Sequence, residues 1–173
     1  MVAVFDGQLM KGISMQQYFR GALAGLVLVL TGAQAFAQEE PEAGSLMLSD
    51  ILATIENSGE RLIYSADFHI RNWEIVSCPD RSRRCREDTI NPADGQVRRT
   101  DTELVGLLPP EGAMPLSEIV RQVEAMNVGR ISSVEFDDRR WEVETRAGLG
   151  RRAELRIEPM SGAVWRCEGR ACP

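Results

Sequence analysis

The sequence predicts an α+β protein made of two tandem units, each with one helix packed on an antiparallel sheet of three or four strands. Three observations support this prediction. The segment 48–75 recurs in altered form as the segment 116–143. Within each copy, the apolar spacing changes from a helical pattern to strict alternation. The same Pro-x-x-Gly turn closes both copies. The chain has 173 residues, which is enough for two small units.

The repeat aligns 48–75 with 116–143 without a gap, and more than a third of the aligned positions are identical. The identical pairs include the Phe, Trp and Glu of the predicted strands. The closing segment INPADGQVRR (90–99) then matches IEPMSGAVWR (157–166). The offset between these two segments is one residue shorter than the offset between the two segments of the first alignment. We interpret the chain as a tandem duplication of one unit of about 65 residues.

Each unit is predicted to open with an amphipathic helix. Its apolar residues recur at three- and four-residue spacing: Leu48, Ile51, Leu52 and Ile55 in the first unit, and Leu116, Ile119, Val120 and Val123 in the second. Ser49 and Ser117 are the predicted N-caps. Gly59 and Gly129 follow the apolar pattern and are the expected helix stops.

After each helix the apolar period becomes two, which predicts strands with one dry and one wet face. In the second unit these strands are expected at 134–136, 141–145 and 153–157, with a last one at 163–167 after the Pro159 to Gly162 turn. In the first unit they are expected at 63–68, 73–78, 86–90 and from Gln96 onward. Trp73 and Trp141 fall on the dry face and are assigned to core packing.

The start of the chain predicts a Sec-type signal peptide. Lys11 and Arg20 precede the apolar run ALAGLVLVLTG, and Ala35-Phe36-Ala37 fits the small-x-small cleavage rule. We expect cleavage after Ala37, with the true start at Met10 or Met15. The apolar run is too short to span a membrane, which favours cleavage over an uncleaved anchor helix.

This division gives five segments: a signal peptide at 1–37, a disordered acidic N-terminus at 38–45, a first unit at 46–104, a Pro-rich connector at 105–113 and a second unit at 114–173. Pro109 and Pro110 mark the connector, since neither can continue a helix or a central strand. The expected location is periplasmic or secreted, with no membrane insertion after signal cleavage.

The expected mature chain, from Gln38 to Pro173, is acidic. Without Lys11 and Arg20 the 20 basic residues become 18, and without Asp6 the 26 acidic residues become 25, so the net charge is near −7. This balance argues against a nucleic-acid partner.

All four cysteines follow the predicted signal peptide: Cys78, Cys85, Cys167 and Cys172. An even number in an exported chain indicates two disulfides. Their spacing favours the local pairs Cys78–Cys85 and Cys167–Cys172 among the three connectivities. A zinc site and a redox pair are disfavoured, because close ligand spacing, a nearby His and a Cys-x-x-Cys motif are all missing.

The second unit resembles the PepSY domain family. The resemblance lies in LSEIVRQVE, in the alternating VEFDDRRWEVET and in the closing IEPMSGAVW, and it extends more loosely to the segment 46–99. Glu158 and Ser161, and Asn91 and Asp94 in the first unit, replace the Asp and Thr usual in the family's closing turn. The resemblance implies an inhibitory or regulatory module of secreted and envelope proteins, with no catalytic motif.

The residues themselves favour no enzyme. His69 is the single histidine, and it is expected in a surface turn. Without a His or Cys partner, nucleophilic catalysis is not supported. Glu135, Asp137 and Asp138 lack the spacing of a calcium loop and are expected in a solvated turn. No metal site and no cofactor are predicted. Cross-strand ion pairs are expected on the wet face, joining Glu142 and Glu144 to Arg152 and Arg156.

The strongest difference between the copies is CPDRSRRCRED (78–88), where Arg81, Arg83, Arg84 and Arg86 surround an expected disulfide. Such a closed cationic loop could contact an acidic partner. The favoured alternative is a stapled hairpin whose arginines only solvate it. We expect a non-catalytic exported binding module that inhibits or regulates a peptidase or another enzyme, with another exported protein as its partner. The alternative is a structural or assembly factor of the cell envelope.

Overall fold

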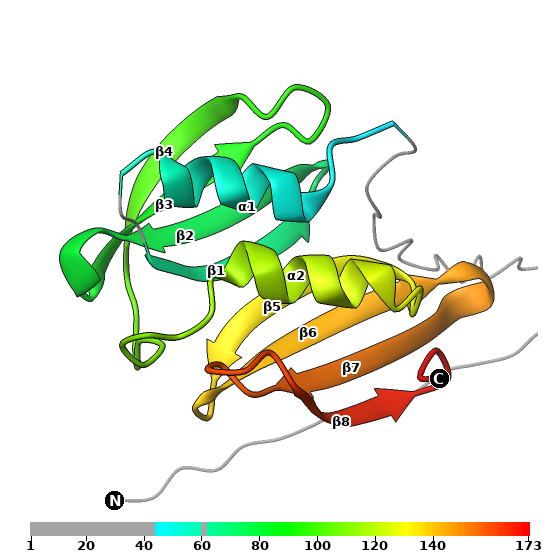
Figure 1. Cartoon of the computed structure of the whole chain (residues 1–173). Coiled ribbons are helices and arrows are strands. Elements are labelled where there is room, and N and C mark those ends of the chain that lie inside the picture. Colours follow the sequence, from blue (N-terminus) through cyan, green and yellow to red (C-terminus); the bar gives the residue numbers. More distant parts are fainter. Residues whose placement is uncertain (1–43, 60–61) are drawn as a thin grey trace, which may run out of the picture. The chain divides into compact units, whose positions relative to one another are not determined.

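The computed structural model describes residues 44–59 and 62–173, so the predicted signal peptide and most of the acidic N-terminus lie outside the described residues. Each half contains one helix followed by four antiparallel strands (Figure 1). The first half comprises α1 (Leu48–Asn57), β1 (Leu62–His69), β2 (Asn72–Cys78), β3 (Arg84–Ile90) and β4 (Val97–Leu104). The second comprises α2 (Leu116–Ala125), β5 (Arg130–Asp137), β6 (Arg140–Ala147), β7 (Arg151–Ile157) and β8 (Val164–Gly169).

The α+β class and the two meanders agree with the sequence, but the two expected sheets are in fact one. All eight strands form a single antiparallel sheet in the order β4-β3-β2-β1-β5-β6-β7-β8. The first strand of each half pairs with the first strand of the other, so each half leaves only its last strand at an edge.

The seam between β1 and β5 follows the symmetry of the repeat. Ala66 pairs with Val134, which is its own equivalent in the second half. On either side, Ser65 pairs with Glu135 and Asp67 pairs with Ser133, so each pairing is the mirror of the other. This reciprocal pattern is that of an isologous two-fold interface, here built within one chain.

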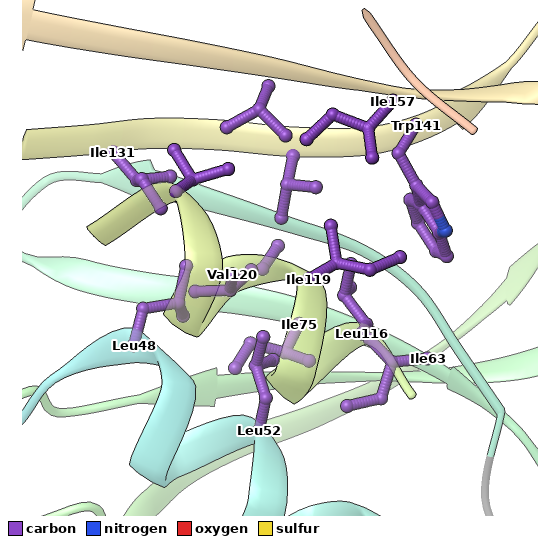
Figure 2. Packing of buried hydrophobic residues seen from close by; sticks show 14 of the residues in the cluster. Leu48, Leu52, Ile63, Ile75, Leu116, Ile119, Val120, Ile131, Trp141 and Ile157 are labelled. Atoms are coloured by element: carbon purple, nitrogen blue, oxygen red, sulfur yellow. The ribbon is translucent and has the colours of Figure 1, made fainter. Parts of the chain in front are cut away.

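Both helices pack on the same face of the sheet and lie beside each other (Figure 1). Figure 2 shows Leu48 and Leu52 of α1 meeting Leu116, Ile119 and Val120 of α2. The same cluster contains buried strand residues from both halves: Ile63, Ile75, Ile131, Trp141 and Ile157. The core is therefore shared, and neither half could bury its helix fully without the other.

The predicted N-caps are wrong. Ser49 and Ser117 are the second residues of their helices, while Met47 and Pro115 occupy the N-cap positions and make no side-chain cap bond. The carboxylates that satisfy the first turns come from the opposite helix. Glu56 Oε1 accepts the Ser117 N–H at 3.3 Å, and its Oε2 accepts the Ser117 hydroxyl. The antiparallel helices thus complete each other's exposed N–H groups.

The repeated closing turn anchors the segment that enters each helix. The carbonyl oxygen of Pro92 accepts the Leu46 N–H at 2.8 Å, and that of Pro159 accepts the Met114 N–H at 2.8 Å. Gly162 has φ +68° and lies against Met114, where an added Cβ would be 2.9 Å from the Met114 sulfur. The Pro-x-x-Gly motif recurs because both halves need this tight turn and this anchor.

Candidate binding surface

The side of the sheet opposite the helices, called here the helix-free face, presents polar side chains from every strand. Alternation and strand register place them between the buried core positions. Its carboxylates are Asp67, Glu74, Glu87, Asp101 and Glu103 in the first half, and Glu135, Asp137, Glu142, Glu144, Glu154 and Glu168 in the second. They occur on both sides of the seam, where Glu135 lies opposite Ser65 and Asp67 lies opposite Ser133.

Asp67 lies at the centre of this surface, on the seam strand β1. Partial desolvation, followed by the charges of Glu135 and Glu74, raises the pKa of Asp67 to about 6. Much of the Asp67 surface is accessible to solvent, but carboxylates from neighbouring strands surround it. Desolvation and the nearby Glu103 likewise raise the pKa of Glu87. The middle of the helix-free face therefore disfavours further negative charge and favours a cation.

The charge balance changes toward β8. Arg156 bridges Glu142 at 3.3 Å and Glu154 at 3.5 Å, as expected for one of the predicted cross-strand pairs. In the strand register, Glu144 lies opposite Glu154 and Arg152 lies opposite Arg146. The first half and the seam are thus the more acidic part of the helix-free face.

The connector covers one corner of the helix-free face. Val105 packs there with Val76 and the Cys78–Cys85 disulfide in a small second cluster. Arg83 holds this segment with two bonds, since its Nε donates to the Val105 carbonyl at 3.0 Å while its own carbonyl accepts the Val105 N–H at 3.0 Å. The Arg81 guanidinium donates to the Pro109 carbonyl.

The four arginines of the predicted partner-binding loop therefore have different roles. Arg81 and Arg83 anchor the connector, and Arg86 pairs with Asp88, which is only 1% exposed and also accepts a bond from Thr100. Within the described residues, the Arg84 side chain is the one among them for which no bond is seen, and it is exposed. Three of the four cations thus stabilise the fold.

The remaining predicted residues lie as follows. His69 is exposed at the end of β1. Glu135 and Asp137 belong to β5 and Asp138 to the following turn, and no three His, Cys, Asp or Glu side chains gather for a metal in the described ranges. Trp73 and Trp141 are buried in the core, each with a phenylalanine against it edge-on.

The alternation of apolar and polar residues identified the solvent-facing residues of each strand, but it did not show that those of all the strands form one surface. The sequence signal for this surface was an acidic residue at a solvent-facing position of nearly every strand. Recognising the surface required the β1–β5 pairing, which joins the two sets.

Both cysteine pairs are oxidised: Cys78 with Cys85, and Cys167 with Cys172. Disulfides persist in oxidising compartments, which indicates an extracytoplasmic protein. None of the helices in the described part of the chain has the length and apolar character needed to cross a bilayer.

No family model and no curated protein matches the chain, so the PepSY resemblance depends on the motifs quoted above. Among solved structures, the chain is similar to one described as a putative lipoprotein from Clostridium difficile 630. That likeness has a TM-score of 0.44 and 9% sequence identity, over 75% of this chain and 96% of the other. Similarity at this level carries no argument about activity.

Proposed function

We propose that this protein is a non-catalytic, exported binding module whose helix-free face binds a protein partner with a basic surface. The observation that supports it is the sheet itself, with one face covered by two helices and the other presenting carboxylates across the seam. Desolvation, followed by the charges of Glu135 and Glu74, raises the pKa of Asp67, and a cationic partner group would offset both effects.

The biological role in this proposal is inhibition or regulation of an exported peptidase or another exported enzyme. The PepSY-like motifs support that role, and so do the two disulfides, which suit a periplasmic or secreted protein whose Sec-type signal is cleaved after Ala37. The partner proposed here is basic, unlike the acidic partner that the arginine loop had suggested. Arg81 and Arg83 are engaged with the connector, which makes the loop the weaker choice.

The test is partner capture by cross-linking in the exported compartment, followed by purified binding. Neutralising Glu74 and Glu135, which flank Asp67, as the double variant Glu74→Gln/Glu135→Gln should weaken binding at least tenfold. Raising the ionic strength should weaken wild-type binding as well.

The matched control is Asp50→Asn/Glu118→Gln, which removes the same charge from exposed positions in the first turns of the two helices, on the other side of the sheet. Equal loss of binding in the two double variants would show that net charge matters and not this surface. Unchanged binding in Glu74→Gln/Glu135→Gln would reject the helix-free face as the site.

A further inference from the structure

The strand β8 lies at one edge of the sheet, where it pairs with β7 on its inner side (Figure 1). In the described part of the chain, no other strand lies along its outer side. After Gly169 the chain turns away from this edge, because the Ala171 N–H donates to the Arg152 carbonyl on β7 at 3.1 Å. The Cys167–Cys172 disulfide packs against the core on the helix side. The outer side of β8 can therefore accept another strand.

The side chains that β8 presents on the helix-free face carry opposite charges. Arg166 lies opposite Arg156 of β7, and Glu168 lies opposite Glu154. The Arg166 and Glu168 side chains are 57% and 49% exposed, and they pair with each other along the strand. A second copy of β8 can run antiparallel to this strand, with Cys167 of both copies at the two-fold axis. Each Arg166 then faces Glu168 of the other copy, which gives two ion pairs between the chains.

The charges favour this register over its neighbours. A shift of the pairing by one residue would place the helix-free face of one copy beside the helix side of the other. The next registers that keep the faces aligned place Arg166 opposite Arg166, or Glu168 opposite Glu168, and like charges directly opposite are destabilising. The β8 strand is therefore complementary to itself when the pairing is centred on Cys167.

Trp165 distinguishes this edge of the sheet from the opposite edge. Its side chain is 57% exposed, and the Arg140 guanidinium carbon lies 4.1 Å from the centre of its ring. The equivalent residue of β4 is Arg98, which pairs with Asp94 and keeps that edge charged. In the register centred on Cys167, Trp165 faces the Gly169 of the other copy, which has no side chain to obstruct the ring. Because exposed tryptophans are enriched at protein contacts, β8 is favoured over β4 as an interface.

We propose that β8 is the interface of a homodimer, in which the β8 strands of two copies pair antiparallel about Cys167. The two eight-stranded sheets then continue as one. The two-fold axis is perpendicular to the sheet, so the two helix-free faces join into one surface. This inference does not depend on the function proposed above. Each β8 strand has six residues, so the contact is small and we expect a dissociation constant of roughly 10–100 µM.

The test is sedimentation equilibrium of the mature protein with both disulfides intact. Arg166→Glu leaves two carboxylates on the outer strand, and Glu168→Arg leaves two guanidinium groups. Each variant alone should dimerise at least tenfold more weakly than the wild type, because both contacts between the chains become repulsive. An equal mixture of the two variants should form dimers at least as tight as those of the wild type, since every contact then joins opposite charges. Both variants keep a negative net charge, so overall charge does not favour their association.

The matched control is the ion pair of the other edge strand, between Arg99 and Asp101 of β4. Arg99→Glu and Asp101→Arg change the same charges there and should leave dimerisation unchanged. The proposal is rejected if the wild type is monomeric at about 1 mM, or if the single β8 variants dimerise as the wild type does. It is also rejected if the mixture of folded β8 variants stays monomeric, if the β4 variants weaken association equally, or if association continues beyond the dimer.

Discussion

Glu56, near the end of α1, accepts the backbone N–H and the hydroxyl of Ser117 in the first turn of α2, a residue far away in the sequence. Its repeat equivalent Glu124 returns the contact by accepting the Ser49 N–H. The two helices therefore close each other's N-termini, and the stability of each depends on a residue of the other.

Removing Glu56 should destabilise the protein more than removing Glu124. Glu56→Ala leaves the Ser117 N–H and hydroxyl without their acceptor, and we expect the free energy of unfolding to fall by about 1–2 kcal/mol. Glu124→Ala removes only the long hydrogen bond from the Ser49 N–H. We expect it to lower the free energy of unfolding by about 0.5 kcal/mol. Urea unfolding of both variants measures the difference. Exposed Glu118→Ala is the control for helix charge, and a loss there equal to that of Glu56→Ala would contradict the capping role.

Asp67 should make the protein less stable as the pH rises through the acid range. Its pKa is about 6 in the folded protein against 3.8 for the ordinary group, so the folded state binds the proton more tightly. Stability contributed by this group is present below about pH 4 and is lost by about pH 6. Asp67→Asn should remove that dependence and raise stability at pH 7 by about 1 kcal/mol, a figure reduced for solvent screening.

The measurement is the difference in urea midpoint between Asp67→Asn and the wild type at several pH values. Glu56, Glu87 and Glu142 also have a raised pKa, mainly through desolvation, so the wild type alone would mix their effects. A difference that stays constant between pH 4 and pH 7 would show that Asp67 titrates normally.

Gly129 should not tolerate a side chain. Its φ is +117°, and an added Cβ would lie 2.5 Å from the Arg146 carbonyl oxygen. We expect Gly129→Ala to lower the free energy of unfolding by about 2 kcal/mol or more, because backbone must move on both strands. Gly148→Ala is the matched control, since an added Cβ there meets nothing within 4 Å. Similar melting temperatures for the two variants would refute the close approach.

The two disulfides should contribute unequally. The Cys78 and Cys85 side chains are buried with Val105 under the connector, whereas Cys167 and Cys172 are only partly buried. Both close short loops worth about 2–2.5 kcal/mol by chain entropy. Cys78→Ala/Cys85→Ala also leaves a cavity, so we expect a loss of about 3 kcal/mol, against about 2 kcal/mol for Cys167→Ala/Cys172→Ala. Equal losses in guanidinium unfolding would mean that the connector does not need this cluster.

Much of the fold could be predicted because the duplication repeats each pattern of apolar residues, so that each copy supports the interpretation of the other. The strands and the tryptophan core positions follow from alternation, which specifies the face of each side chain. Alternation says nothing about which strand lies alongside which, so the β1–β5 seam and the single sheet could not be predicted. Sequence spacing likewise could not show that Glu56 caps α2, since a local serine was the nearest candidate.

The arginine loop shows a different limit. From the sequence, arginines in a loop are expected to be solvent-exposed cations. Composition does not show which hydrogen-bond acceptors, distant in sequence, they meet in the fold. The acceptors here are carbonyl oxygens of Val105 and Pro109, which arrive only when the connector crosses the sheet.

The seam also determines how the chain must fold. β1 is synthesised a whole repeat unit before its partner β5, so it remains an edge strand with unpaired backbone groups until the second half is in place. We therefore expect docking of the halves to be the late, slow step of folding. Because the seam joins two strands that are distant in sequence, β1 of one chain can meanwhile form the same pairing with β5 of another chain. Refolding at high protein concentration should consequently yield domain-swapped oligomers, and dilution should restore the single chain.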